Sequence, residues 1–225
     1  MKKLLAAIIA AALLLSGCSL SSRPAVSAPP AETPSPSPTP IVTPTPEPEP
    51  SDDELVLVRD YIPGIFIDLK YATTDNFTGQ VIYDSDEAYL RYGTVKKLLC
   101  AQNELSGRGL SLKIWDAYRP VSAQFKLWEI CPNPVYVSDP NNGYSKHSRA
   151  NTVDITLVTD TGKSIPMPSG FDDFTSLADR DYSDVSAEAA ENARLLESIM
   201  VENGFVPYSG EWWHYSDSVI YDVYE

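Results

Sequence analysis

Two histidines, His147 and His214, are the only ones in this chain of 225 residues, and each lies near a carboxylate in sequence. Asp154 follows the first histidine, and Glu211 precedes the second. Two neutral imidazoles and one carboxylate are the usual three protein ligands of a catalytic zinc ion, with a fourth position left for water. We therefore expect His147, Asp154 and His214 to bind one metal ion, and Glu211 to reach the same site without being a ligand.

The segment between the first two of these residues must bend. Residues 153–158 alternate between apolar and polar, which is typical of a strand with Asp154 on its less apolar face. His147 lies at an odd offset from Asp154, so in one straight strand the two side chains would point to opposite faces. We expect the polar residues 148–152 to turn the chain so that both side chains reach one ion.

A structural role for the same residues stays open at this point. A single histidine near aromatic residues is more often packed or exposed than a metal ligand. A single glutamate is most often a solvated carboxylate. The His-Glu-x-x-His helix, which is the commonest zinc-protease signature, does not occur in the chain.

Periodic apolar residues predict the elements that position these side chains. A Ser186 cap and Gly204 bracket a long amphipathic helix at 186–203, and residues 165–184 are rich in loops. Mixed strands and helices without regular alternation indicate a single α+β domain over residues 54–225, with a small antiparallel or mixed sheet flanked by helices. Further helices are predicted at 94–105 and 122–130, and strands at 63–71, 112–118, 153–158, 205–207 and 212–215.

The first 17 residues have the pattern of a secretory signal. Lys2 and Lys3 precede an apolar run, 4–15, that is too short for a comfortable membrane span. The run ends in Leu-Ser-Gly-Cys18, which resembles the lipobox of bacterial lipoproteins. We expect Cys18 to be lipidated and to become the first residue of an exported, lipid-anchored protein.

Residues 18–53 form the predicted lipidated terminus and stalk, and they hold eleven of the nineteen prolines. Such a composition favours an extended spacer without a packed core. Removing Lys2 and Lys3 leaves 15 basic against 31 acidic residues, a formal charge of −16. This charge argues against nucleic acid as a partner, and it leaves the acyl chains as the only predicted membrane contact.

Two cysteines remain besides Cys18. Outside the reducing cytoplasm, Cys100 and Cys131 can form a disulfide, and two free buried thiols are equally compatible with the sequence.

Four separated segments resemble, in order, those of the bacterial zinc D-alanyl-D-alanine dipeptidases, which include enzymes of vancomycin-resistance clusters. Ser145-x-His147 with Asp154 resembles the first zinc motif of that family, and Glu211-x-Trp-His214 resembles the second. Residues 68–77 resemble a segment specific to dipeptidases, and residues 115–120 the segment that carries an essential arginine.

The resemblance implies a zinc enzyme that hydrolyses the D-alanyl-D-alanine dipeptide. His147, Asp154 and His214 would hold one Zn²⁺ per chain, and Glu211 would act as general base. It further implies that Arg119 stabilises the oxyanion, that Ser145 binds the substrate carboxylate and that Asp172 binds its ammonium group.

The chain departs from the family pattern near two of these residues. Ala150 and Thr152 stand where the family usually has Gly and Ala, and Ala150 suggests a slightly altered loop because Gly would allow a positive φ. Phe171-Asp172 resembles the family segment that binds the substrate ammonium group. Met167-Pro168 stands where the family commonly has Met-Gly before this pair, and the loop is one residue shorter, so Asp173 is an alternative to Asp172 as the ammonium ligand.

Two other functions compete with the dipeptidase. A zinc D,D-carboxypeptidase that trims the stem peptides of peptidoglycan would share both zinc motifs but should lack the segment 68–77. A non-catalytic lipoprotein that binds the cell wall would need neither Glu211 nor Arg119, since binding alone requires neither a base nor an oxyanion donor. The sequence leaves the oligomeric state and the physiological role open.

Overall fold

The computed structural model describes residues 48–224. The predicted signal peptide, the lipidation site at Cys18 and most of the predicted stalk lie outside the described residues. Asp52 and Asp53, at the end of the predicted stalk, contact the folded part: their backbone oxygens accept hydrogen bonds from Gly93 (2.9 Å) and Arg91 (2.6 Å). In the described part of the chain, no helix is long and apolar enough to span a membrane.

A five-stranded mixed sheet forms the centre of the domain, in the order β2-β4-β5-β7-β6. β2 pairs in parallel with β4, and the remaining neighbours are antiparallel. Two further strands, β1 (Leu55–Leu57) and β3 (Tyr89–Arg91), form a separate antiparallel pair. The sheet strands are β2 (Phe66–Ile67), β4 (Leu110–Asp116), β5 (Thr152–Thr159), β6 (Phe205–Tyr208) and β7 (Glu211–Asp217).

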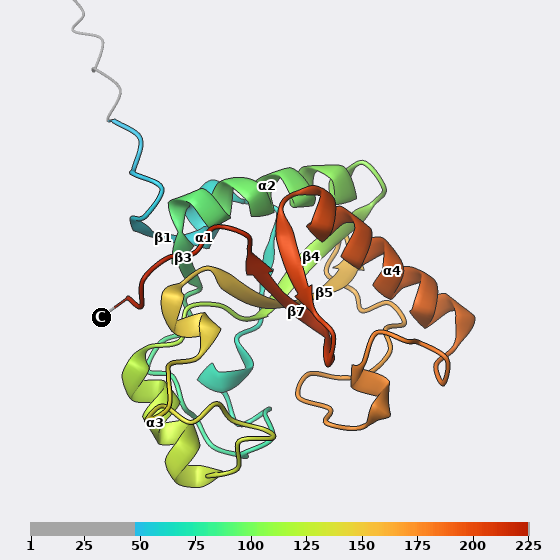
Figure 1. Ribbon diagram of the computed structural model, residues 1–225. Helices are drawn as coiled ribbons and strands as arrows, with labels where there is room; N and C mark the ends of the chain where they lie inside the picture. The colour runs from blue at the N-terminus through green and yellow to red at the C-terminus, as the bar shows by residue number, and fades with distance from the viewer. Residues whose placement is uncertain (1–47, 225) are drawn as a thin grey trace, which may run out of the picture. The chain divides into compact units, whose positions relative to one another are not determined.

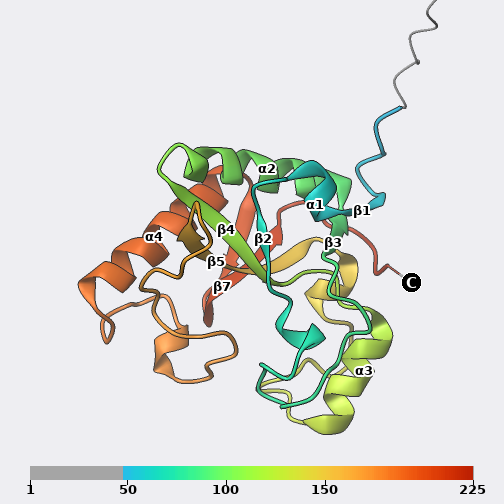
Figure 2. The same cartoon turned by 180° about the vertical axis from the view of Figure 1, so that it is seen from behind.

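Two long helices, α2 (Tyr92–Ser106) and α4 (Ala187–Glu202), lie along the same side of the sheet, and α3 (Val121–Ile130) lies away from them in both views (Figures 1 and 2). The Ser186 side chain caps α4 by accepting a hydrogen bond from Ala189 N at 3.2 Å, as predicted. A short helix, α1, spans Val58–Tyr61, and three 3-10 helices span Lys70–Ala72, Lys146–Arg149 and Ser176–Ala178.

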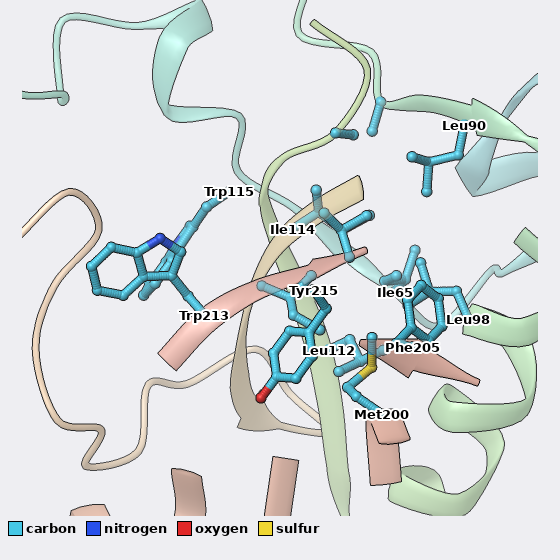
Figure 3. Close-up of a cluster of buried hydrophobic side chains, with 14 of the residues drawn as sticks. Ile65, Leu90, Leu98, Leu112, Ile114, Trp115, Met200, Phe205, Trp213 and Tyr215 are labelled. Carbon is cyan, nitrogen blue, oxygen red and sulfur yellow. The ribbon is translucent and has the colours of Figure 1, made fainter. Parts of the chain in front are cut away.

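The main core lies between the sheet and these two helices. Leu112 pairs with Leu157, and Val153 pairs with Tyr215, so the apolar residues of three strands share one face. Figure 3 shows Leu112 and Tyr215 close to Met200 of α4. The opposite face therefore carries the polar residues of the same strands, including Asp154.

Two sequence predictions need correction, and one pair of strands was not predicted. The strand predicted at 63–71 is only β2, because the chain leaves the sheet after Ile67 and turns into the 3-10 helix at Lys70. The β1–β3 pair was not predicted, since strands of three residues are too short to show alternation. Both cysteines within residues 48–224 are free thiols, but they are not buried: Cys100 is exposed and Cys131 is partly exposed.

The predicted α+β class and single domain are confirmed for the described residues. The other predicted helices and strands are present, with ends that differ by at most two residues.

Candidate metal centre

The predicted ligands come together where three elements meet. Asp154 of β5 and His214 of β7 are direct partners across the sheet, and His147 lies in the 3-10 helix that leads into β5. His147 Nε2 lies 3.3 Å from Asp154 Oδ2, and His214 Nδ1 lies 2.9 Å from Asp154 Oδ1. One ligand atom from each residue lies within 4.8 Å of the others, which fits a single ion.

The chain bends between His147 and Asp154, as the odd offset requires. Ser145 Oγ caps the 3-10 helix by accepting a hydrogen bond from His147 N at 3.3 Å. Ala150 ends that helix in the left-handed region, with φ 57° and ψ 28°. The loop thus has the positive φ that Gly would adopt more readily, and Ala150 adopts it despite its Cβ.

The imidazoles are oriented by their other contacts. His147 Nδ1 lies 2.9 Å from the carbonyl oxygen of Ala117, so a proton on Nδ1 leaves Nε2 free to face Asp154. A backbone acceptor of this kind is the usual outer partner of a metal-binding histidine. The cluster therefore fits a metal ion by its donor set, its spacing and its surroundings, with His147 using Nε2 and His214 using Nδ1.

Burial and charge set the protonation of these groups. Burial favours the neutral form of Asp154, but His147 and His214 outweigh it and hold the pKa of Asp154 well below its usual range. Burial also disfavours the charged form of His147, yet the Asp154 and Asp116 carboxylates raise the pKa of His147. Burial lowers the pKa of His214.

Glu211 lies beside the cluster without joining it. Its Oε2 is 3.5 Å from His214 Nδ1, and it is the first residue of β7, opposite Tyr208 at an irregular step of the β6–β7 pairing. An odd offset would place Glu211 and His214 on opposite faces of a regular strand, and this position at the hairpin end brings them together. Burial and the Asp154 carboxylate raise the pKa of Glu211 to about 7.

Arg119 lies on the other side of His147 and is 8% exposed. Its Nη2 donates to Asp116 Oδ2 at 2.6 Å, and its backbone N donates to His147 O at 3.2 Å. Asp116 Oδ2 is itself 3.6 Å from His147 Nδ1. Burial disfavours the charge on Arg119, but Asp116 more than offsets this and raises the pKa of Arg119. The guanidinium thus stays positive next to the cluster.

Asp172 is connected to Arg119 through Tyr71. Tyr71 OH donates to Asp172 Oδ2 at 2.8 Å, and the Arg119 guanidinium lies over the Tyr71 ring at 5.0 Å. Asp172 has a positive φ of 53°, and burial raises its pKa to about 8 against the opposing hydrogen bond from Tyr71. Asp173 Oδ1 instead accepts from Thr175 N within its own turn. The geometry therefore favours Asp172 over Asp173 at the site.

Three side chains of the site were missed by the sequence analysis: Asp116, Tyr71 and Tyr83. Tyr83 OH donates to Asp116 Oδ1, and it accepts a bond of 3.4 Å from Arg119 Nε. Each of the three lies in or near a segment that was singled out, but their contacts join segments far apart in sequence. The only available signal was the position of Asp116 three residues before Arg119.

The chain matches a known protein family. The family model Peptidase_M15, described as D-ala-D-ala dipeptidase, matches residues 51–221. Proteins named D-alanyl-D-alanine dipeptidase are similar to this chain. The protein from Escherichia coli K12 is 40% identical, covering 72% of this chain and 83% of the relative. The one from Enterococcus faecium is 36% identical, covering 69% and 87%, and the one from Enterococcus faecalis 34%, covering 73% and 91%.

A solved structure titled "VanYB in complex with D-Alanine-D-Alanine" aligns with a TM-score of 0.41 and 17% identity, covering 60% of this chain and 75% of that one. This likeness is too distant to bear on the site.

Proposed function

Because the chain belongs to the Peptidase_M15 family of D-Ala-D-Ala dipeptidases, we propose that it hydrolyses the D-alanyl-D-alanine dipeptide to two molecules of D-alanine. The observation that carries this proposal is the separation of roles in the site. Three residues form a compact metal-binding cluster, and a fourth, Glu211, lies 3.5 Å from one of them with a pKa raised to about 7. A general base works best with a pKa near the working pH.

We assign zinc to the cluster. Two imidazoles and one carboxylate are a common donor set of catalytic zinc, and His147, Asp154 and His214 supply it. When bound, zinc lowers the pKa of a coordinated water and polarises the substrate carbonyl. The measurement that tests this assignment is the metal content of the purified protein, with His147→Ala, Asp154→Ala and His214→Ala each expected to lose the ion.

Glu211 moves the proton in this reaction. Its carboxylate accepts a proton from the attacking water and passes it to the nitrogen of the leaving D-alanine as the peptide bond breaks. Its raised pKa favours both halves of this transfer near neutral pH.

Arg119 stabilises the oxygen on which negative charge develops. Three of its five N–H donors are engaged by Asp116, Gln124 and Tyr83, which leaves one N–H on each terminal nitrogen for the substrate. A side chain held by three partners can stabilise the transition state without first having to reorganise.

Ser145 and Asp172 bind the two ends of the substrate in this proposal. Ser145 Oγ accepts a hydrogen bond from His147 N, and its own proton remains available to a substrate carboxylate. The Asp172 carboxylate suits an ammonium group. A site that pairs both termini of a small zwitterion selects for length, because a longer peptide leaves one of the paired groups unsatisfied.

The test is an assay of the purified protein with D-Ala-D-Ala and with a pentapeptide that ends in D-Ala-D-Ala. We expect hydrolysis of the dipeptide only. Hydrolysis of the pentapeptide alone would instead identify a D,D-carboxypeptidase. If both peptides stay intact with a full complement of metal, the non-catalytic alternative gains and the proposal fails.

We also propose that this domain acts outside the cytoplasm, anchored by lipid at Cys18. The support is the N-terminal sequence: two lysines, a short apolar run and Leu-Ser-Gly-Cys. The formal charge of −16 after removal of residues 1–17 argues against binding of nucleic acid or anionic lipid.

A further inference from the structure

Arg180 holds the hairpin that carries both Glu211 and His214. Its Nη2 donates to the carbonyl oxygens of Glu211 at 3.0 Å and His214 at 3.1 Å. Its Nε donates to the carbonyl oxygen of Tyr208 at 2.7 Å, across the hairpin turn. One guanidinium therefore binds the backbone on both sides of the turn from β6 to β7.

The same guanidinium is fixed from the opposite side. Its Nη1 donates to Glu197 Oε2 of α4 at 2.9 Å and to Tyr215 OH at 3.1 Å, and it lies over the Tyr215 ring at 4.6 Å. Arginine has five N–H donors, and these five hydrogen bonds use all of them. The Arg180 side chain is only 10% exposed. An ammonium group has three donors without the planar fork, so lysine cannot reproduce the arrangement.

Glu211 and His214 depend on this contact to different degrees. His214 is also held by its ladder partner Asp154 in the middle of the sheet. Glu211 stands at the hairpin end, where the β6–β7 register is irregular, and its strand partner Tyr208 is bound by Arg180 as well. Loss of Arg180 should thus shift the Glu211 backbone more than that of His214.

We propose that Arg180 is a positioning residue, which holds the Glu211 carboxylate at its working distance from the metal cluster by fixing the hairpin backbone. The inference rests on the proposed function, because it takes Glu211 as the general base. Because the Glu211 backbone should shift more than that of His214, the effect of losing Arg180 should appear in turnover and not in the retention of metal or in substrate affinity. A small displacement of a catalytic group can lower the rate by one to two orders of magnitude.

The first test is Arg180→Lys, which keeps the charge and loses the fork. We expect kcat for D-Ala-D-Ala to fall about tenfold or more with little change in KM and with metal content unchanged. Arg194→Lys is the matched control: Arg194 lies over the Tyr182 ring at 5.4 Å and has no contact with the hairpin among the described residues. We expect wild-type kcat for the control.

The decisive measurement combines Arg180→Lys with Glu211→Gln. If Arg180 acts through Glu211, removal of the base removes the reason for the effect, and Arg180→Lys should lower the residual kcat less than twofold in the Glu211→Gln background. A general structural role would give the same fold loss in both backgrounds, and that result would overturn the proposal.

Glu197→Ala tests the proposal without changing Arg180. Glu197→Ala removes the charged anchor of the guanidinium in α4. We expect kcat to fall less than in Arg180→Lys, about two- to fivefold. Glu197→Gln should keep the wild-type kcat, because its amide oxygen still accepts from Nη1.

An unchanged kcat in both Arg180→Lys and Glu197→Ala contradicts the inference, as does loss of metal in proportion to activity. An inactive wild-type protein would instead refute the proposed function itself.

Discussion

Three carboxylates in the site differ in pKa because their neighbours differ. Asp154 lies between two imidazoles, and its pKa is held well below its usual range. Glu211 and Asp172 are partly buried near other acids, and their pKa values are raised to about 7 and about 8. Environments that shift the pKa values of carboxylates in opposite directions suit these groups to different roles. In this site the roles are those of a metal ligand, a general base and a group that binds a cationic partner.

At Asp172 the raised pKa has a consequence for stability. The pKa of Asp172 is about 8 in the folded protein, against an ordinary value of 3.8. Protonated Asp172 therefore stabilises the folded state fully below pH 4, and this contribution is lost as the pH rises to 8. Asp172→Asn should therefore be as stable as the wild type near pH 4 and more stable above pH 8, by several kcal/mol at about 1.4 kcal/mol for each unit of the pKa shift. Asparagine tolerates the positive φ of this position.

Urea unfolding of the substrate-free protein from pH 4.5 to 8.5 (about the range between those pKa values) measures this difference. Asp173→Asn is the control, because its oxygen can still accept the bond from Thr175 N and Asp172 stays in place. An Asp172→Asn effect that is constant across the range contradicts the argument. The gain in stability should come with a higher KM, since the substrate ammonium loses its counter-charge.

At the residue scale, the sequence predicted which three residues gather in the cluster but not their surroundings. The scarcity of histidine drew attention to His147 and His214, and the alternation of β5 placed Asp154 away from the apolar face. The roles of Tyr71 and Arg180 could not be found in this way, and for Asp116 the only signal was its position three residues before Arg119. Their roles depend on contacts between segments that lie far apart in sequence, and no local pattern encodes such contacts.

At the scale of elements, the Gln102 side chain of α2 supplies a hydrogen-bond acceptor to β4 where β2 does not pair with it. β2 pairs with β4 only at Lys113 and Ile114, so the preceding backbone of β4 has no β2 partner. Gln102 is 3% exposed, and its Oε1 accepts hydrogen bonds from Leu112 N at 2.9 Å and from Ser111 Oγ at 3.2 Å. The side chain thus ties α2 to the sheet at a point where the ladder ends.

We predict that Gln102→Leu lowers the free energy of unfolding by about 1–3 kcal/mol, because Leu112 N is left buried without an acceptor. Asn103→Leu, at the exposed neighbouring position in α2, should change stability by less than about 0.5 kcal/mol. Chemical denaturation of both variants measures the two values. Equal effects would show that the Gln102 contact contributes nothing particular.

Elements with a clear apolar period were predictable, and the others were not. The stripe of Val95, Leu98, Leu99 and Leu105 predicted α2; Leu99 is partly buried, and the other three are fully buried. The strand prediction around β2 failed because apolar residues continue past the end of the strand. Leu69 and Tyr71 are buried, but Tyr71 lies in a 3-10 helix and Leu69 is the residue before it. Burial alone does not distinguish a strand from a turn packed against the same core.

At the scale of the whole molecule, the proposed lipid anchor would have to hold an acidic chain at the membrane. The chain has a formal net charge of −14, so an anionic lipid surface repels it. Cys18→Ser should release the protein from the membrane fraction or leave it unprocessed. Cys100→Ser is the control, since Cys100 is an exposed free thiol. Unchanged membrane attachment of the Cys18→Ser variant, with a normal mature N-terminus, would refute the anchor.

The central claim is that Glu211 is a base beside a metal cluster and not a fourth ligand. Glu211→Gln keeps the size of the side chain but cannot accept the proton of water. We predict that this variant retains its metal and its affinity for D-Ala-D-Ala, and that kcat falls by about two to four orders of magnitude. Loss of metal from Glu211→Gln would make Glu211 a ligand, and full turnover with metal retained would leave the mechanism without its base.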